Sequence, residues 1–283
     1  MSKPQAAIHP RVLVFDSGIG GLSIAGCIHQ ALPSVPLVYL ADSAGFPYGG
    51  QPEAVVVERS VRLIGEVLAT LPCDIVVVAC NTASTVVLPA LRAMTDTPVI
   101  GVVPAIKPAA ALSRNRRIGL LATPATVTRP YLAELIEAHA SDCLIERVGH
   151  PDLVCWIEGL MADEKLPSKE LGSALQPFRD ARVDTVVLGC THYPLVMPLL
   201  KELLPGVLHW VDSGEAIARR VAWLLAQAGQ DCSDSRSSCS QPMERVLFTG
   251  PLPEGLAGFL AGLGLSTGQL SGNWPRPENE QGQ

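Results

Sequence analysis

The sequence has little charge, few aromatic residues and no long apolar run. Charged residues make up 17% and aromatic residues 5% of its 283 residues, while apolar residues make up 48%. A membrane-spanning helix needs about 18 or more consecutive apolar residues, and the chain contains no such run. Residues 1–10 also lack the basic and then apolar order of a signal peptide. We therefore expect a cytoplasmic protein with a sizeable buried core and no membrane partner.

Positive charge is scarce as well. The formal net charge is −6, and no run of five or more Lys and Arg residues occurs. The electrostatic footprint of a nucleic-acid-binding protein is therefore absent, and we expect no nucleic-acid partner. Of the five lysines, Lys107 alone lies near the end of a predicted strand, and Pro108 follows it. That setting does not favour the Schiff base that a pyridoxal phosphate enzyme needs.

Eight cysteines are present, but none forms a C-x-x-C pair. This pattern is unlike that of zinc and thioredoxin-type sites, and a disulfide framework is typical of much shorter secreted chains. We expect no metal, and most of the thiols should behave as small apolar side chains. Cys80 and Cys190 stand apart because each directly follows an apolar run.

Short apolar runs alternate with longer amphipathic stretches along the chain. Continuous runs rich in β-branched residues are typical of strands that are covered on both faces of a parallel sheet. We predict strands at residues 12–15, 37–40, 75–79, 99–102, 118–121 and 186–188. We predict helices at residues 21–31, 52–69, 83–94, 128–138, 194–204 and 214–228. This alternation predicts an α/β fold, in which ligands bind beyond the carboxyl ends of the strands.

One internal repeat is the strongest feature of the sequence. Residues 74–80 and residues 184–190 both run from an aspartate through an apolar strand to a cysteine. Hydrogen-bonding residues and then a predicted helix follow each cysteine. A weaker similarity relates residues 11–17 to residues 117–123. The duplication predicts two similar halves that face each other across a cleft.

We therefore predict two doubly wound α/β domains with mainly parallel sheets, related by a pseudo-twofold axis, with the active site in the cleft between them. The first domain comprises residues 10–105 together with 213–270, and the second comprises residues 106–212. Residues 271–283 are rich in Pro, Glu and Gln and are predicted to be a disordered tail. Residues 229–243 are polar and rich in serine, so we predict a loop there and assign it no role.

Two thiols at equivalent strand ends suit the transfer of a proton from one face of a carbon atom to the other. A single base tends to return a proton to the face from which it came, whereas two groups on opposite faces can invert the centre. The unperturbed thiol pKa of about 8.5 allows one group to act as a thiolate and the other as a thiol. A helix that begins after a cysteine stabilises the thiolate. One such cysteine is more often an inert core residue, but the matched pair favours a function.

Asp16 and Ser17 end the first predicted strand and open a glycine-rich turn at residues 18–21. The glycines allow a close approach of the backbone to a ligand, and the helix that follows favours an anion. A dinucleotide-binding loop is the alternative, because Asp42 follows the second strand at a suitable distance. However, Ser23 replaces the third glycine of that motif, and Asp16 would lie beside a pyrophosphate. We favour a role for Asp16 in receiving an ammonium group or steering a proton.

Three further features accompany the cysteines. Residues 46–50 follow the second predicted strand and form either an ordinary Pro/Gly turn or a loop that faces a ligand. His192 lies in the repeat just after Cys190 and could polarise that thiol or a substrate carboxylate. Glu158 could be the acidic partner of His192, although a solvated helix carboxylate is the simpler interpretation of that residue alone.

At these positions the sequence resembles the glutamate racemases of bacterial cell-wall synthesis. The matching segments are residues 15–21, 47–49, 79–83, 123–126, 188–194 and 211–213. They occur in the family's order and span roughly three-quarters of the chain. The two cysteine segments together with the Asp-Ser-Gly turn are the most specific of them.

The resemblance implies an isomerase that interconverts L- and D-glutamate for peptidoglycan synthesis, without a metal or an organic cofactor. It implies that Cys80 handles the proton of the D-enantiomer, assisted by Asp16. Cys190 would handle that of the L-enantiomer, assisted by His192 with Glu158 behind it. The groups implied to hold the substrate are Asp16, Ser17, Tyr48, Gly49, Asn81, Thr82, Thr126, Thr191 and His192. Members of the family commonly form homodimers, so a homodimer is one assembly to expect.

Other functions stay open on the sequence. An aspartate or other amino-acid racemase of the same superfamily would share both cysteines, although the Asp-Ser-Gly and Pro-Tyr-Gly loops favour glutamate. A hydrolase with Cys190 as its nucleophile and His192 as its base would leave Cys80 and the repeat unexplained. In a binding module without activity, substitution of either cysteine would leave the function intact.

Overall fold

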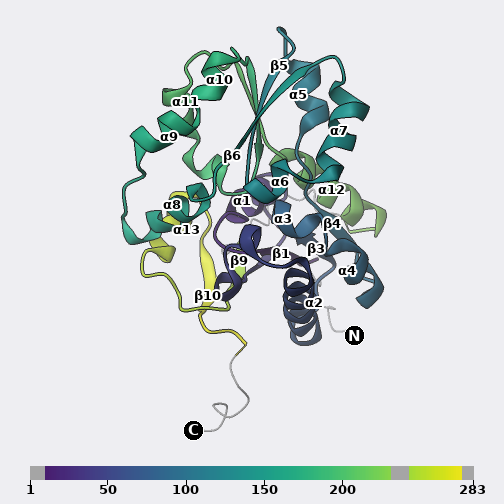
Figure 1. Ribbon diagram of the computed structural model, residues 1–283. Coiled ribbons are helices and arrows are strands. Elements are labelled where there is room, and N and C mark those ends of the chain that lie inside the picture. The colour runs from purple at the N-terminus through teal and green to yellow at the C-terminus, as the bar shows by residue number, and fades with distance from the viewer. Residues whose placement is uncertain (1–9, 231–241, 276–283) are drawn as a thin grey trace, which may run out of the picture.

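The computed structural model describes residues 10–230 and 242–275, whose strands form two sheets (Figure 1). The six-stranded sheet has the order β10-β9-β2-β1-β3-β4, the four-stranded sheet has the order β6-β5-β7-β8, and all of their pairings are parallel. The strands are β1 (Val12–Asp16), β2 (Leu37–Ala41), β3 (Ile75–Val78), β4 (Val99–Gly101), β5 (Arg117–Ala122), β6 (Leu144–Gly149), β7 (Thr185–Gly189), β8 (His209–Val211), β9 (Met243–Phe248) and β10 (Thr267–Ser271). The α/β fold with two parallel sheets is therefore confirmed.

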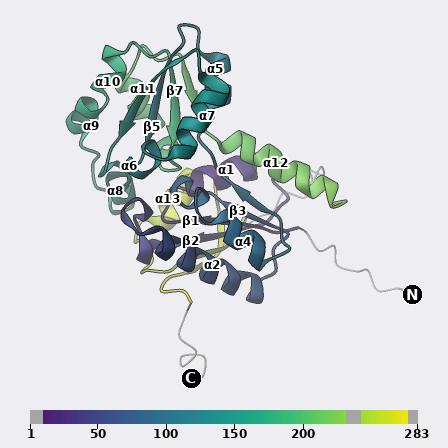
Figure 2. The same ribbon diagram turned by 45° about the vertical axis from the view of Figure 1, so that its right-hand side comes forward.

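Helices cover both faces of each sheet (Figures 1 and 2). The helices are α1 (Leu22–Ala31), α2 (Glu53–Thr70), α3 (Asn81–Ser84), α4 (Leu88–Met94), α5 (Ile106–Leu112), α6 (Pro124–Val127), α7 (Pro130–Ala140), α8 (Leu153–Glu158), α9 (Ser168–Ala174), α10 (Gln176–Asp180), α11 (Met197–Leu203), α12 (Gly214–Gln227) and α13 (Leu256–Gly262). Helices α2 and α4 pack on one face of the first sheet, and α1 and α12 pack on the other. Helices α5 and α7 pack on one face of the second sheet, and α9, α10 and α11 pack on the other.

Burial on both faces explains why the central strands are continuous apolar runs. In β1, Val12 and Val14 pack into one core cluster, while Leu13 and Phe15 pack into another, because successive side chains of a strand point to opposite faces. Every residue of β1, β2, β3 and β7 is buried. One of the core clusters extends from the first sheet to the second, so the two halves share a continuous apolar core.

The second sheet repeats the arrangement of the first. Four strands of the first sheet lie in the order β2-β1-β3-β4, and the second sheet has the same order when its strands are counted from β5. The register repeats too, because Val12 of β1 pairs with Ile75 of β3. The equivalent pair in the second sheet is Ile118 with Thr185. The cysteines that follow β3 and β7 therefore occupy equivalent positions. On the basis of this repeat we propose the domain bounds given above: residues 10–105 together with 213–270 form the first domain, and residues 106–212 form the second.

Each of the six predicted strands is present, with ends that differ by no more than one residue. Four strands, β6, β8, β9 and β10, were not predicted. The first three residues of β9 include Glu244 and Arg245, and β6 contains Glu146 and Arg147, so neither strand is a continuous apolar run. Strands β6, β8 and β10 lie at sheet edges and are mostly not buried, since Val148 in β6 and Val211 in β8 are the buried residues among them and β10 has none.

Two predicted helices are interrupted. The predicted helix at residues 83–94 is wrong as a single element, because α3 ends at Ser84 and α4 begins at Leu88. The predicted helix at 194–204 is a 3₁₀ turn (Tyr193–Val196) followed by α11. Helices α4 and α11 each have a proline in the first turn, where its missing N–H costs no helical hydrogen bond. A proline there starts a new helix rather than continuing an old one.

The predicted tail at residues 271–283 is only partly described. Ser271 ends β10, and the backbone N–H of Trp274 donates to the carbonyl of Phe248, so residues 271–275 pack on the first sheet rather than forming a disordered tail. The remaining residues of that segment, and residues 231–241 of the predicted loop at 229–243, lie outside the described residues. In the described part of the chain, no helix has both the length and the apolar character that a membrane crossing requires.

Candidate active site

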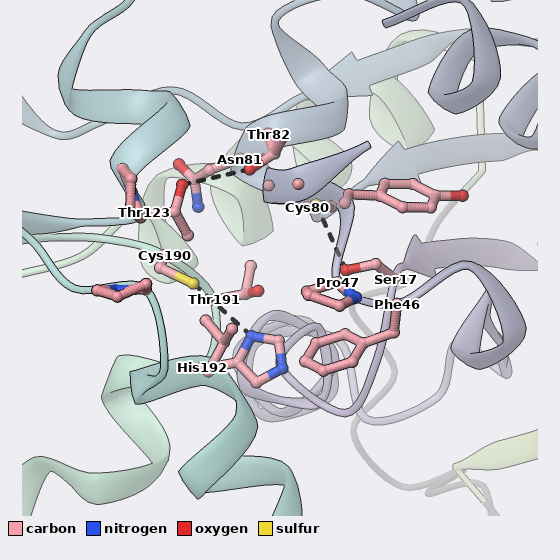
Figure 3. Close-up of a pocket in the computed structure, with 16 residues that line it drawn as sticks. Ser17, Phe46, Pro47, Cys80, Asn81, Thr82, Thr123, Cys190, Thr191 and His192 are labelled. Atoms are coloured by element: carbon pink, nitrogen blue, oxygen red, sulfur yellow. Dashed lines mark hydrogen bonds between the residues drawn. The ribbon is translucent and has the colours of Figure 1, made fainter. Parts of the chain in front are cut away.

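The two cysteines of the repeat face one cavity between the halves. Its volume is about 200 Å³, below the roughly 300–1,000 Å³ of sites for drug-sized ligands, so it suits a small molecule. Figure 3 shows Cys80 and Cys190 on different walls, with Ser17 beside the first and His192 beside the second. The cavity is lined by Ser17, Phe46, Pro47, Tyr48, Gly49, Gly50, Cys80, Asn81, Thr82, Thr123, Pro124, Pro151, Val154, Cys190, Thr191 and His192.

Most of the residues singled out in the sequence lie at this cavity. The predicted ligand-facing loop at 46–50 forms one wall. Asp16, Glu158 and Thr126 do not line the cavity but contact residues that do. Thr123 lines the cavity but was not assigned, although it opens the matched segment 123–126. Pro124, Pro151 and Val154 were not predicted either: Pro124 lies in that same segment, where Thr126 alone was assigned, and the other two lie outside the matched segments. Their apolar side chains make part of the wall supplied by the second half.

On the first wall, Cys80 ends the segment after β3 and directly precedes α3. Its Sγ atom lies 3.8 Å from the Oγ atom of Ser17, which follows β1. Burial raises the pKa of Cys80 well above its usual range, and the nearby Asp16 carboxylate adds to the shift. The resting form of Cys80 is therefore the thiol, which has to lose its proton before Cys80 can act as a base.

On the second wall, Cys190 has a different neighbour. The Nδ1 atom of His192 lies 3.7 Å from the Sγ atom of Cys190, and its Nε2 atom lies 2.7 Å from Oε1 of Glu158. Burial works to lower the pKa of His192, but its contacts with Cys190 and Glu158 outweigh burial and raise that pKa well above the ordinary value. These contacts therefore favour the protonated form of His192, which lies close to the sulfur of Cys190.

Glu158 also joins the two halves. Its Oε1 atom accepts a hydrogen bond of 2.7 Å from the backbone N–H of Ile19, in the turn before α1. On the same side of the cavity, the hydroxyl of Ser23 donates to the carbonyl of Thr191 at 2.8 Å. These contacts hold the start of α1 against the segment that carries Cys190 and His192.

The glycines of the turn at 18–21 allow this close approach. A Cβ atom at Gly20 would lie 2.5 Å from the hydroxyl of Thr191 and would also collide with the ring of His192. A Cβ atom at Gly18 would collide with the carboxylate of Glu158. The sequence predicted a close approach of this turn to a ligand, but at Gly18 and Gly20 the close neighbour is the other half of the protein.

Asp16 is fully buried beside the cavity. Its Oδ2 atom accepts a hydrogen bond of 3.0 Å from Thr191, and its Oδ1 atom accepts one of 3.0 Å from the N–H of Gly18. Burial raises the pKa of Asp16 to about 6, although attraction to His192 and these hydrogen bonds partly offset the effect. A carboxyl group with such a pKa can change its protonation state near neutral pH.

Neutral hydrogen-bonding groups make up most of the remaining polar lining. Thr82 lies 3.5 Å from Thr123 (hydroxyl to hydroxyl), and Thr123 lies 3.0 Å from Thr126, so a chain of hydroxyls crosses from the first half to the second. The Oδ1 atom of Asn81 is buried and has no hydrogen-bond partner within the described residues. A buried polar atom without a partner is costly, so it indicates a place for a ligand donor. Tyr48 differs, because its hydroxyl donates to Asp42, away from the cavity.

The chain is similar to known racemases along most of its length. Residues 21–221 match the family described as Asp/Glu/Hydantoin racemase. A glutamate racemase of Sodalis glossinidius (strain morsitans) is 45% identical over 274 residues, which cover 96% of this chain and 94% of that protein. A glutamate racemase of Actinobacillus pleuropneumoniae serotype 7 (strain AP76) is 44% identical over 246 residues, which cover 87% of this chain and 90% of that protein.

The fold agrees with the sequence match. The crystal structure of Escherichia coli glutamate racemase in complex with L-glutamate and the activator UDP-MurNAc-Ala has a TM-score of 0.83 and 43% identity, and the alignment covers 93% of this chain and 97% of that one. Two parallel sheets, a repeated cysteine motif and a family match over most of the chain lead to one assignment. The chain belongs to the Asp/Glu/hydantoin racemase family and, within it, to the glutamate racemases.

Proposed function

We propose that this protein interconverts L- and D-glutamate by a two-thiol proton transfer that uses no organic cofactor. One observation supports this function above all: Cys80 and Cys190 end equivalent strands of a repeated fold and line the same small cavity from different walls. A proton can then leave the α-carbon on one face while another arrives on the opposite face, which inverts the centre.

For D-glutamate, Cys80 passes its thiol proton to the neighbouring Asp16 carboxylate and then takes the α-proton as the thiolate, while the Cys190 thiol delivers a proton to the other face. The C–H bond breaks with its electron pair left on the carbon, and the new C–H bond forms with the proton from sulfur. The reverse reaction begins at Cys190 with L-glutamate. His192 is close enough to Cys190 to stabilise its thiolate, and Glu158 keeps His192 protonated. Positioned groups of this kind contribute about 10²–10⁴-fold to rate.

The substrate's charged groups need partners that do not compete for the α-proton. The hydroxyls of Ser17, Thr82 and Thr191, the Asn81 amide and the backbone at Gly49 line the cavity and can donate to carboxylates. Thr126 supports this set through Thr123, and Asp16 is suited to receive the ammonium group or to steer the proton at Cys80. Tyr48 contributes its ring and backbone.

The product would serve peptidoglycan synthesis, which consumes D-glutamate. We place the reaction in the cytoplasm, and a homodimer is the assembly that the family resemblance suggests. Neither is needed for the chemistry above, because both thiols come from one chain.

The test is incubation of the purified protein with D-glutamate in deuterated water, without added cofactor. Optical rotation should decay to zero, and deuterium should appear at the α-carbon of the product. D-aspartate run in parallel tests the substrate: racemisation of aspartate and not of glutamate would keep the chemistry and reject glutamate. If neither acid exchanges its α-proton, the racemase function is rejected.

A further inference from the structure

A buried cluster around Asp42 lies behind the loop at residues 42–50, called the cavity loop below, and binds the hydroxyl of Tyr48. Asp42 follows β2 and is fully buried. Its Oδ2 atom accepts hydrogen bonds from the hydroxyl of Tyr48 at 2.6 Å and from Nε of Arg59 at 2.7 Å. Its Oδ1 atom accepts from Nη2 of Arg59 at 2.6 Å and from the hydroxyl of Thr249 at 2.7 Å. Both oxygens of this carboxylate are thus held by two donors each.

The cluster joins three segments that are far apart in the sequence. Tyr48 belongs to the cavity loop, Arg59 lies on α2, and Thr249 follows β9 near the C-terminal end of the chain. The hydroxyl of Thr249 also accepts a hydrogen bond of 2.9 Å from the N–H of Ala44, at the start of the same loop. Both ends of the loop between Asp42 and Tyr48 are therefore fixed to one carboxylate and to the end of β9.

This arrangement gives Tyr48 its orientation. Tyr48 lines the cavity, yet only 2% of its surface is exposed and its hydroxyl points to Asp42. The ring packs against Phe15 of β1, with 6.3 Å between ring centroids. The next residue, Gly49, lines the cavity with its backbone, and a Cβ atom there would lie 3.8 Å from Thr123 across the cleft. The position of Tyr48 thus sets where this backbone meets a ligand.

The surroundings of the cluster favour the charged forms of both Asp42 and Arg59. Burial works to raise the pKa of Asp42, but the hydrogen bonds from Arg59, Tyr48 and Thr249 outweigh it and leave that pKa below its ordinary value. The bond to Asp42 raises the pKa of Arg59. Removal of one partner of a buried ion pair is strongly destabilising, so the cluster is better tested at Thr249, which is neutral and does not line the cavity.

We propose that Asp42 is a positioning residue for the glutamate reaction. It holds the Tyr48 hydroxyl, and through it the backbone at Gly49, in the place where the substrate binds, while Thr249 ties this assembly to the end of β9. This inference rests on the proposed function, since it concerns how that substrate is held. Asp42 acts through Tyr48 and does not touch the substrate.

The experiment compares Thr249→Val, which removes one donor to Asp42 at constant shape, with Thr249→Ser, which keeps the hydroxyl. We expect Thr249→Val to raise KM for both enantiomers about tenfold, with kcat within about twofold of wild type, because a lost hydrogen bond to a charged group corresponds to roughly 1.5 kcal/mol or more. The protection that D-glutamate gives against thermal unfolding should weaken in parallel. Thr249→Ser should restore both values.

Glu244→Gln is the matched structural control. Glu244 lies at the other end of β9 and pairs with Arg11 at 2.7 Å, so its substitution weakens the attachment of the same strand without touching the loop. We expect Glu244→Gln to lower Tm and leave KM unchanged. A Thr249→Val variant that lowers Tm but keeps the wild-type KM would overturn the positioning role alone. Wild-type protein that does not racemise glutamate would overturn the proposed function, and this inference with it.

Discussion

The Oδ2 atom of Asp16 accepts a hydrogen bond of 3.0 Å from the hydroxyl of Thr191, so a buried carboxylate of the first half is bonded to the residue that follows the second thiol. This contact couples the two walls of the cavity. It also leaves Asp16 in surroundings that disfavour its charge, since burial raises its pKa to about 6.

We expect Asp16→Asn to be more stable than the wild type at pH 7. An aspartate titrates near 3.9 in an unfolded chain, so a folded-state pKa of about 6 means that Asp16 contributes most to stability below about pH 4. About 2–3 kcal/mol of that contribution is lost as the pH rises from about 4 through 6. The variant has no such loss. Urea unfolding of both proteins at several pH values between 4 and 7 measures the difference. A difference that does not change with pH would contradict the burial of an ionisable Asp16.

We expect the two cysteine variants to separate the two halves of the reaction. Cys190→Ser should lose at least about 10²-fold in racemisation but still exchange the α-proton of D-glutamate with deuterated water, because Cys80 remains. Cys80→Ser should exchange the α-proton of L-glutamate instead. NMR of each enantiomer, incubated separately, measures the exchange. The reversed pattern would exchange the roles given to the two thiols.

We expect Glu158→Gln to move the alkaline limb of the kcat/KM profile to lower pH. The carboxylate helps to raise the pKa of His192, and its loss lets burial lower that pKa. Profiles of kcat/KM report ionisations of the free enzyme. Glu164→Gln removes an equal charge from a nearby exposed position and should leave the limb in place. An unshifted limb in Glu158→Gln would show that His192 does not control it.

We expect Gly20→Ala to reduce kcat/KM by at least about 100-fold, because a misplacement of about 1 Å at catalytic groups can cost that much. The added methyl group would displace Thr191 and His192. Gly26→Ala is the control, since a Cβ atom there meets nothing within 4 Å and lies within α1. It should keep activity and raise the free energy of unfolding by about 0.5–1 kcal/mol. Steady-state kinetics and urea unfolding measure both.

The central strands and both cysteines could be predicted because their signals are local. A strand that is covered on both faces must be apolar throughout, and residues 12–15 or 186–188 show this directly. The repeat then identified the strand ends that carry the thiols. Strands β9 and β10 gave no such signal. Glu244 in β9 pairs with Arg11, a partner that only the folded chain brings near.

The orientation of Tyr48 could not be predicted for the same reason. Its position in the Pro-Tyr-Gly segment marks it as a residue of the site, but the direction of its hydroxyl depends on Asp42, Arg59 and Thr249. Thr249 comes from a strand that the sequence did not reveal. The interruptions of the helices at 85–87 and at 193–196 were likewise missed. The amphipathic spacing of the sequence continues across both breaks, although the α-helical backbone is interrupted there.

The repeated strand order of the two sheets matches a property of the reaction itself. Two enantiomers in water have the same free energy, so a racemase works on an equilibrium that favours neither side and has to offer comparable chemistry to both faces of one carbon. A duplicated architecture supplies that symmetry by using one design twice. The copies diverge where Asp16 ends β1 and Ala122 ends β5. At such positions the forward and reverse reactions are free to differ in kcat and in KM, although kcat/KM must be the same in both directions.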